Sequence, residues 1–106
     1  MSGQIATVTD ADFQKFTTQQ GVVLIDFWAP WCGPCRRVAP VIEALSTEMP
    51  NVHFGKLNTD ENQMTAVKNG VMSIPTLMIY KNGQKVDQVV GAVPKEMLVS
   101  SLKKHL

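Results

Sequence analysis

Apolar residues dominate one short stretch of this chain and alternate with polar residues in several others. Residues 22–28 form a nearly continuous apolar run rich in β-branched side chains, as expected of a central strand covered on both faces. Asn82-Gly83 is the strongest hairpin signal, so the strands on either side of it should be antiparallel. Together these patterns predict strands over residues 5–8, 22–28, 52–57, 77–81 and 84–90.

Helical patterns lie between most of these strands. The clearest covers residues 36–49, where apolar residues recur with helical spacing at Val38, Val41, Ile42, Leu45 and Met49. Pro40 lies inside this pattern, so we expect one helix with a bend, because proline lacks a backbone donor and crowds the preceding turn.

The other helices are shorter. Thr9 should cap a helix that runs to about residue 20, with Asp12 completing a shortened capping box. The pattern over residues 60–69 predicts another helix, with Met64 and Val67 on its inner face. Pro94 should begin the last helix of the chain. Alternation of strands and helices followed by a hairpin predicts an α/β fold with a central mixed sheet and helices on both faces.

Length and composition limit the classes of function. The 106 residues suit a single domain that can bury a core without metals or structural disulfides. A net charge of +1 gives no reason to expect nucleic acid or an anionic membrane surface as a partner. The N-terminal residues show no leader pattern and no stretch is long enough to span a membrane, so we expect a cytoplasmic protein, or else one whose organellar leader has been removed.

Both cysteines, Cys32 and Cys35, lie at the predicted start of the long helix. Such a pair can bind part of a metal site, form a structural disulfide, or cycle between dithiol and disulfide. A structural disulfide is a poor explanation, because so short a loop restricts the unfolded chain very little. A zinc site would need further ligands, and His53 and His105 lack the spacing of familiar zinc fingers.

Redox chemistry suits the position of the pair. Cys32 would lie at the helix N-terminus, where unpaired N–H groups favour a thiolate, whereas Cys35 lies one turn further in. We therefore expect Cys32 to attack and Cys35 to resolve, with Pro34 suited to the first turn. An isolated pair of cysteines also fits a reducing compartment.

Three other residues allow both a functional and a structural interpretation. Asp26 interrupts the apolar run, either as a satisfied core carboxylate or as a functional one, since a buried carboxylate is costly. Lys56 is either a solvated residue at a sheet edge or a residue that approaches Asp26. Trp31 could be a core side chain or part of a binding surface, and Trp28 fits the core better.

The segment FWAPWCGPC, residues 27–35, resembles the active-site signature of the thioredoxin family, and the likeness covers essentially the whole chain. Further matching positions are Asp26, Pro40, Ile74-Pro75-Thr76 and Gly91. The resemblance implies the thioredoxin fold, a five-stranded mixed sheet flanked by four helices, with the strand before the cysteines in the middle. It also implies a single domain over residues 1–106.

For the chemistry, the resemblance implies a protein dithiol–disulfide oxidoreductase that works through a mixed disulfide. Asp26 would handle the proton of the Cys35 thiol, and Lys56 would approach Asp26. Gly33, Pro34 and Pro40 would support the site. The substrate groove would be formed by Trp31, Ile74, Pro75, Gly91 and Ala92, with a cis bond between Ile74 and Pro75.

The resemblance also implies how the protein is used. It would act as a monomer on disulfide-containing proteins and receive electrons from an NADPH-dependent flavoprotein reductase. Its own redox centre would be the Cys32–Cys35 disulfide, with no bound cofactor and no metal. A non-catalytic interaction or chaperone role for the same surface is the alternative.

Overall fold

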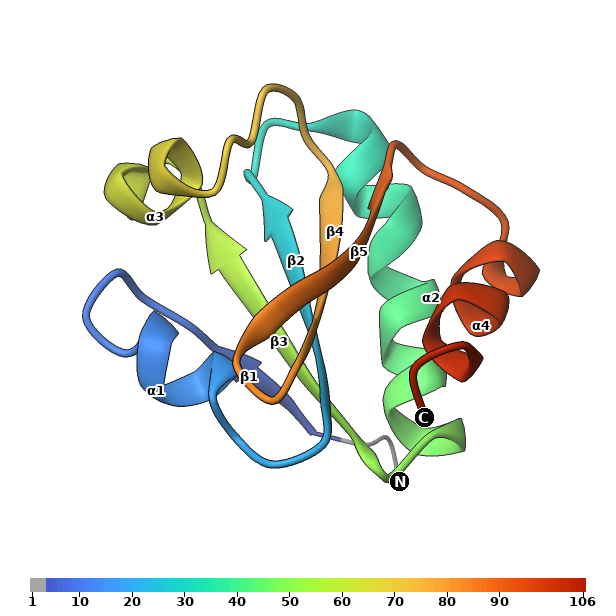
Figure 1. The fold of residues 1–106 in the computed structure, drawn as a ribbon. Coiled ribbons are helices and arrows are strands. Elements are labelled where there is room, and N and C mark those ends of the chain that lie inside the picture. The colour runs from blue at the N-terminus through green and yellow to red at the C-terminus, as the bar shows by residue number, and fades with distance from the viewer. Residues whose placement is uncertain (1–3) are drawn as a thin grey trace.

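A mixed sheet forms the centre of the computed structural model, which describes residues 4–106 (Figure 1). Within these residues five strands lie in the order β1-β3-β2-β4-β5, so the strand that precedes the cysteines is central, as expected. β1, β3 and β2 are parallel, β4 is antiparallel to β2, and β5 is antiparallel to β4. The strands are β1 (Ile5–Thr7), β2 (Val22–Trp28), β3 (Val52–Asn58), β4 (Thr76–Lys81) and β5 (Gln84–Val90).

Residues 1–3, part of the segment used for the leader prediction, lie outside the described residues. In the part of the chain that the structure describes, no helix has the length and apolar character needed to cross a bilayer.

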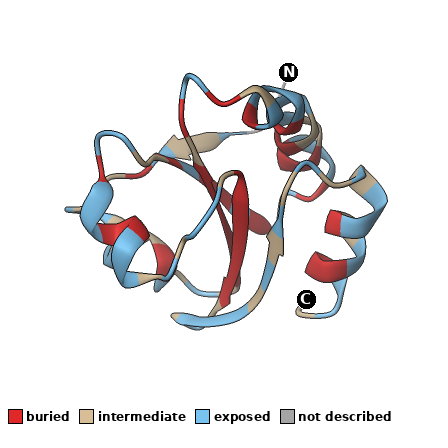
Figure 2. Ribbon diagram, turned by 90° about the horizontal axis from the view of Figure 1, so that it is seen from above, coloured by how far each residue is buried: buried red, intermediate tan, exposed pale blue. Residues whose placement is uncertain are grey.

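Helices cover both faces of the sheet (Figures 1 and 2). They are α1 (Phe13–Thr17), α2 (Gly33–Glu48), α3 (Gln63–Lys68) and α4 (Lys95–Lys103). One core packs Val22 and Leu24 of β2 against α2 and α4, and the other packs Val23, Ile25 and Phe27 of the same strand on the side of α1 and α3. Successive side chains of a strand point to opposite faces, so β2 is buried on both sides and its apolar run is explained.

The β4–β5 hairpin confirms the turn prediction. Asn82 and Gly83 have φ values of 53° and 81°, the left-handed conformation that both central residues of a type I′ turn require. The long helix also agrees, since α2 contains Pro40 in its interior. The bend at Pro40 stays a prediction.

The first helix is shorter than its sequence pattern predicted. It begins at Phe13 with Asp12 as its N-cap residue, so Thr9 does not cap it. The bond that Asp12 contributes to a capping box is nevertheless present, since the Thr9 backbone N–H donates to Asp12 Oδ1 at 2.6 Å. Asp10, which would have lain in the first turn, is hydrogen-bonded to α3 through its carboxylate and its own N–H. These long-range bonds hold residues 10–12 in a turn, in place of the first helical turn.

The inner face of α3 was predicted wrongly. Met64 and Val67 are 61% and 77% exposed, whereas Thr65 and Ala66 are buried. The helix has only six residues, and Ala66 packs in the core cluster with Val8 and Phe27. The Asp10 carboxylate also accepts from the Thr65 N–H, so contacts from distant parts of the chain accompany the burial of Thr65 and Ala66.

Gly55 in β3 allows α1 and the end of β1 to approach the sheet closely. A Cβ at this position would lie 2.7 Å from Val8 Cγ2 and 2.8 Å from Phe16 Cε2. We expect Gly55→Ala to lower the free energy of unfolding by about 1–3 kcal/mol through overpacking. Urea unfolding measures this, and a variant as stable as the parent would show that α1 can shift to admit a methyl group.

Candidate active site

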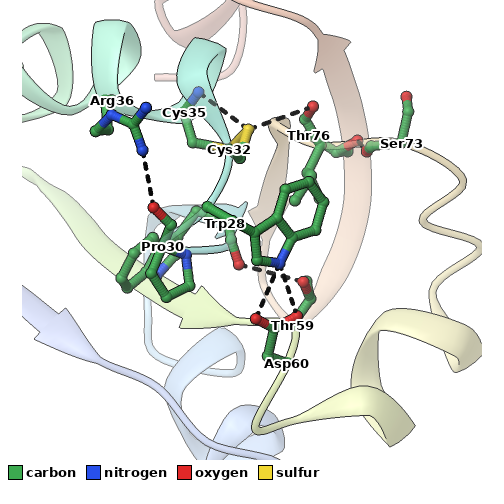
Figure 3. The surroundings of a disulfide bond; sticks show 11 residues. Trp28, Pro30, Cys32, Cys35, Arg36, Thr59, Asp60, Ser73 and Thr76 are labelled. Carbon is green, nitrogen blue, oxygen red and sulfur yellow. Dashed lines mark hydrogen bonds between the residues drawn. A yellow bond between two sulfur atoms is a disulfide. The ribbon is translucent and has the colours of Figure 1, made fainter.

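Cys32 and Cys35 are joined by a disulfide at the point where β2 leads into α2 (Figure 3). Their Cα atoms are 5.3 Å apart, and both side chains are about 3% exposed. β2 ends at Trp28, and a tight turn through Pro30 brings the chain to Cys32, the N-cap of α2. The two sulfurs are thus held at the carboxyl end of the central strand, against the start of the longest helix.

The first turn of α2 places a backbone N–H group next to the sulfur of Cys32. The Cys35 backbone N–H donates to Cys32 Sγ at 3.2 Å, so a sulfur takes the role that a hydroxyl or carboxylate oxygen plays in an ordinary N-cap. N–H groups and the positive end of the helix dipole stabilise negative charge at this position. This geometry favours Cys32 as the thiolate once the disulfide is reduced. Gly33 and Pro34 occupy the turn between the two cysteines.

The loop before β4 covers the other side of the disulfide. Ile74 packs against the cluster of Ala29 and the two cysteines, and its carbonyl oxygen lies 3.8 Å from Cys32 Sγ. The Ile74-Pro75 bond is cis, which confirms the prediction.

The predicted groove residues from the end of β5 join this loop through the backbone. The Gly91 N–H donates to the Pro75 carbonyl at 2.9 Å, which joins the segment after β5 to the loop at Pro75. Gly91 has a φ of 98°, a conformation that side chains other than glycine rarely adopt. Ala92 follows it and is exposed, whereas Pro75 is buried.

Trp31 lies at the surface beside the cysteines. Its side chain is 67% exposed, which removes the core interpretation. The indole N–H nevertheless has a partner, because it donates to both oxygens of Asp60, at 3.0 and 3.2 Å. Sequence reasoning missed Asp60, which it placed only at the start of the helix predicted over residues 60–69. Trp28 is half-buried, and its indole nitrogen is buried without a hydrogen-bond partner.

Asp26 is a buried carboxyl group on the α2 side of β2. It is 6% exposed, and its Oδ1 has no hydrogen-bond partner. Burial raises the pKa of Asp26 from 3.8 to about 7, and the positive charge of Lys56 opposes part of that rise. The carboxyl is therefore poised to gain or lose a proton near neutral pH.

Lys56 and Cys35 lie around the same small space as Asp26. Lys56 pairs with Asp26 in the β2–β3 register, and its Nζ lies 5.7 Å from the centroid of the Trp28 ring. A cavity of about 90 Å³ is lined by Asp26, Trp28, Cys35, Ala39 and Lys56. Lys56 is exposed, so it is solvated as expected, but it does not lie at a sheet edge, because β3 lies between β1 and β2. The approach of Lys56 to Asp26 agrees with the shared cavity. Pro40 is the residue after Ala39 and lies on the exposed side of α2.

The structure does not assemble ligands for zinc around the cysteines. Among residues 4–106, no three His, Cys, Asp or Glu side chains gather in a way that could hold a metal ion. His105 lies 3.3 Å from Asp87 near the C-terminus, and His53 is exposed on β3.

Comparisons with known proteins agree with this geometry. Residues 4–104 match the family model described as Thioredoxin. The chain is 54% identical to thioredoxin 1 of Synechococcus elongatus over 103 residues, covering 95% of this chain and 96% of that protein. It is 53% identical to a thioredoxin of Staphylococcus aureus, covering 96% and 98% of the two chains.

Solved structures show the same likeness. A thioredoxin of Malassezia sympodialis superposes with a TM-score of 0.89 at 38% identity, covering 97% of this chain and 91% of that one. A mutant thioredoxin of Halobacterium salinarum gives a TM-score of 0.90 at 34% identity, covering 96% and 90%.

Proposed function

The chain belongs to the thioredoxin family and is a thiol–disulfide oxidoreductase, and we propose that Cys32 begins its reaction and Cys35 completes it. The observation that carries this order is the hydrogen bond from the Cys35 N–H to the Cys32 sulfur at the start of α2. Only Cys32 occupies the N-cap, where the helix lowers the free energy of a thiolate.

The reaction transfers two electrons from the cysteine pair to a substrate disulfide. The Cys32 thiolate attacks one substrate sulfur, the substrate S–S bond breaks, and the leaving sulfur takes up a proton. Cys35, once deprotonated, attacks the Cys32 sulfur of this mixed disulfide and releases the second substrate thiol. The cysteines end as the disulfide that the structure contains.

Asp26 is the proposed acceptor of the Cys35 proton. Asp26 and Cys35 line the same small cavity, and a pKa of about 7 lets the carboxylate take a proton at neutral pH and return it later. Lys56, at the same cavity, opposes the rise in the Asp26 pKa and so keeps the carboxylate available as a base.

Substrates would bind across the surface made by Trp31, Ile74, Gly91 and Ala92, with Pro75 beneath it. Family members act on disulfide-containing proteins and are reduced by thioredoxin reductase. For this chain we propose an NADPH-dependent flavoprotein reductase as the electron source, so that the protein carries electrons between that enzyme and its substrates. A monomer in the cytoplasm is the proposed form, supported by a single cysteine pair suited to a reducing compartment.

Insulin reduction tests the proposed order and activity together. Purified protein should accelerate the reduction of insulin disulfides by dithiothreitol, and the accelerated rate should require Cys32. A protein that binds unfolded chains but does not accelerate the reduction would instead be the non-catalytic interaction module.

Pro34 separates the two cysteines in the first turn of α2, beside the thiolate site. Pro34→His should make the protein more oxidising, because an imidazolium beside Cys32 stabilises the thiolate and so the reduced form. We expect the glutathione equilibrium constant to change by about tenfold, which corresponds to roughly 30 mV for this two-electron couple. Pro34→Ser is the neutral control; an equal shift in both variants would exclude the imidazolium charge as the cause.

A further inference from the structure

The segment that carries Asp60 is an irregular turn between β3 and α3 held by its own hydrogen bonds. The Asp60 N–H donates to Asn58 Oδ1 at 2.9 Å, and the Asn62 side-chain amide donates to the Asn58 carbonyl at 3.1 Å. The Thr59 N–H donates to the Trp28 carbonyl at 2.8 Å, which fastens the start of the turn to the end of β2. Asp60 itself is exposed, so its side chain depends on this turn for its position.

A distant residue fastens the other end of the turn. The Asp10 N–H donates to Asn62 Oδ1 at 2.8 Å, and the Thr65 N–H donates to Asp10 Oδ1 at 2.9 Å. Asn62 and Thr65 are 8% and 5% exposed, and Asp10 is half-buried, so these bonds are partly shielded from water. Hydrogen bonds from Thr65 also lower the pKa of Asp10, which keeps its carboxylate charged.

We propose that Asp10 is a positioning residue for the substrate groove: it fixes the turn from Asn58 to Asn62 and, through Asp60, the orientation of the Trp31 ring beside Cys32. The contacts are continuous. The Asp10 carboxylate accepts from the Thr65 N–H at the start of α3, and the Asp10 backbone N–H donates to the Asn62 side chain. Asn62 is in turn bonded to Asn58, Asn58 to Asp60, and Asp60 to the Trp31 indole. Asp10 touches neither the cysteines nor Trp31 in any of these contacts. The proposal rests on the oxidoreductase function proposed above, because it assigns Asp10 to the capture of protein substrates.

Replacing Asp10 removes the carboxylate bond to the Thr65 N–H, whereas the backbone bond to Asn62 does not depend on the side chain. Loss of the carboxylate bond should affect large substrates and spare small ones. A protein substrate must pass over Trp31, whereas a small disulfide needs only the sulfur of Cys32. Asp10→Ala should therefore raise the KM for insulin by about threefold to tenfold, the equivalent of one hydrogen bond, with little change in kcat. The rate with a small aromatic disulfide should stay near that of the parent protein.

A direct readout of Trp31 separates positioning from general stability. In heteronuclear NMR, the Trp31 indole N–H should exchange faster with solvent in Asp10→Ala, while the buried Trp28 indole N–H serves as an internal reference. Asp10→Asn keeps an acceptor oxygen for the Thr65 N–H and should restore slow exchange. Asp12→Ala is the matched control, because it removes a carboxylate from the same loop whose hydrogen bond within residues 4–106 is local, to Thr9.

A double variant tests the route through Asp60. In the Asp60→Ala background the indole has already lost its acceptor, so adding Asp10→Ala should change neither the indole exchange nor the KM further. An Asp10→Ala protein with parental indole exchange and KM would overturn the proposal, as would an undiminished Asp10 effect in the double variant. If the alanine variant does not fold, Asp10→Glu makes the same comparison, because its longer side chain displaces the oxygen from Thr65. Parental activity combined with normal Trp31 exchange would refute this inference while leaving the proposed function intact.

Discussion

Cys32→Ser should abolish the reduction of protein disulfides, leaving only the background rate of dithiothreitol. A serine hydroxyl at the N-cap of α2 keeps the hydrogen bond to the Cys35 N–H, so the fold should be retained while the nucleophile is lost. Cys35 remains in this variant, but it lies one turn further into the helix and lacks the N-cap position. We therefore expect it to attack external disulfides very slowly.

Cys35→Ser should behave in the opposite way. Cys32 can still attack, but nothing resolves the mixed disulfide, so the variant should accumulate as a stable covalent adduct with its substrate. Mass spectrometry of both variants after incubation with oxidised insulin distinguishes them. A stable adduct on the Cys32 variant, with none on the Cys35 variant, would reverse the assigned roles.

Asp26→Asn should raise stability and lower activity together. Between about pH 4 and pH 7 the unfolded chain has an ionised Asp26 while the folded protein keeps it protonated, so the unfolded state binds fewer protons. Stability therefore falls as pH rises through this window, by up to about 4 kcal/mol for a shift of this size, and the deficit persists above pH 7. An amide carries no charge, so above neutral pH the variant should be more stable by about 1–4 kcal/mol.

The activity of the same variant should fall because the proposed proton acceptor is gone. Release of the mixed disulfide at neutral pH should slow by up to about 100-fold, at the low end of what a positioned base contributes. Urea unfolding across a pH series and single-turnover insulin reduction measure the two effects. Glu61→Gln, which changes an exposed carboxylate, is the control, and a parental pH dependence of stability in Asp26→Asn would show that another group titrates.

Local signals sufficed where neighbouring residues decide the structure. The apolar run of β2 and the Asn82-Gly83 turn are each determined by residues that are adjacent in the sequence, so the sequence predicted their positions closely. The cysteine pair could be assigned to redox chemistry for the same reason, since its spacing and its place at a helix start are adjacent features of the sequence. Local patterns therefore predicted the central strand, the hairpin and the redox role of the cysteine pair.

Contacts between distant residues account for what the sequence did not predict. The short α1 and the outward faces of Met64 and Val67 both accompany the bonds between Asp10 and the start of α3, which join residues 52 and 55 positions apart. The Asp60 contact with Trp31 has the same character. Neither apolar periodicity nor a capping rule predicts which loop contacts which helix, so these contacts were found only in the folded structure.

The hydrogen bond from Gly91 to Pro75 bears on when the protein becomes chemically competent during its synthesis. Both cysteines are synthesised before half of the chain exists, yet the loop that covers them is fastened only after β5 has been made. β2 likewise needs both β3 and β4 before it is buried on each side. A partly synthesised chain can therefore form the first turn of α2 beside Cys32, but it lacks the loop and sheet that cover the two thiols. Any oxidation of the pair during translation would precede the surface that selects its partners.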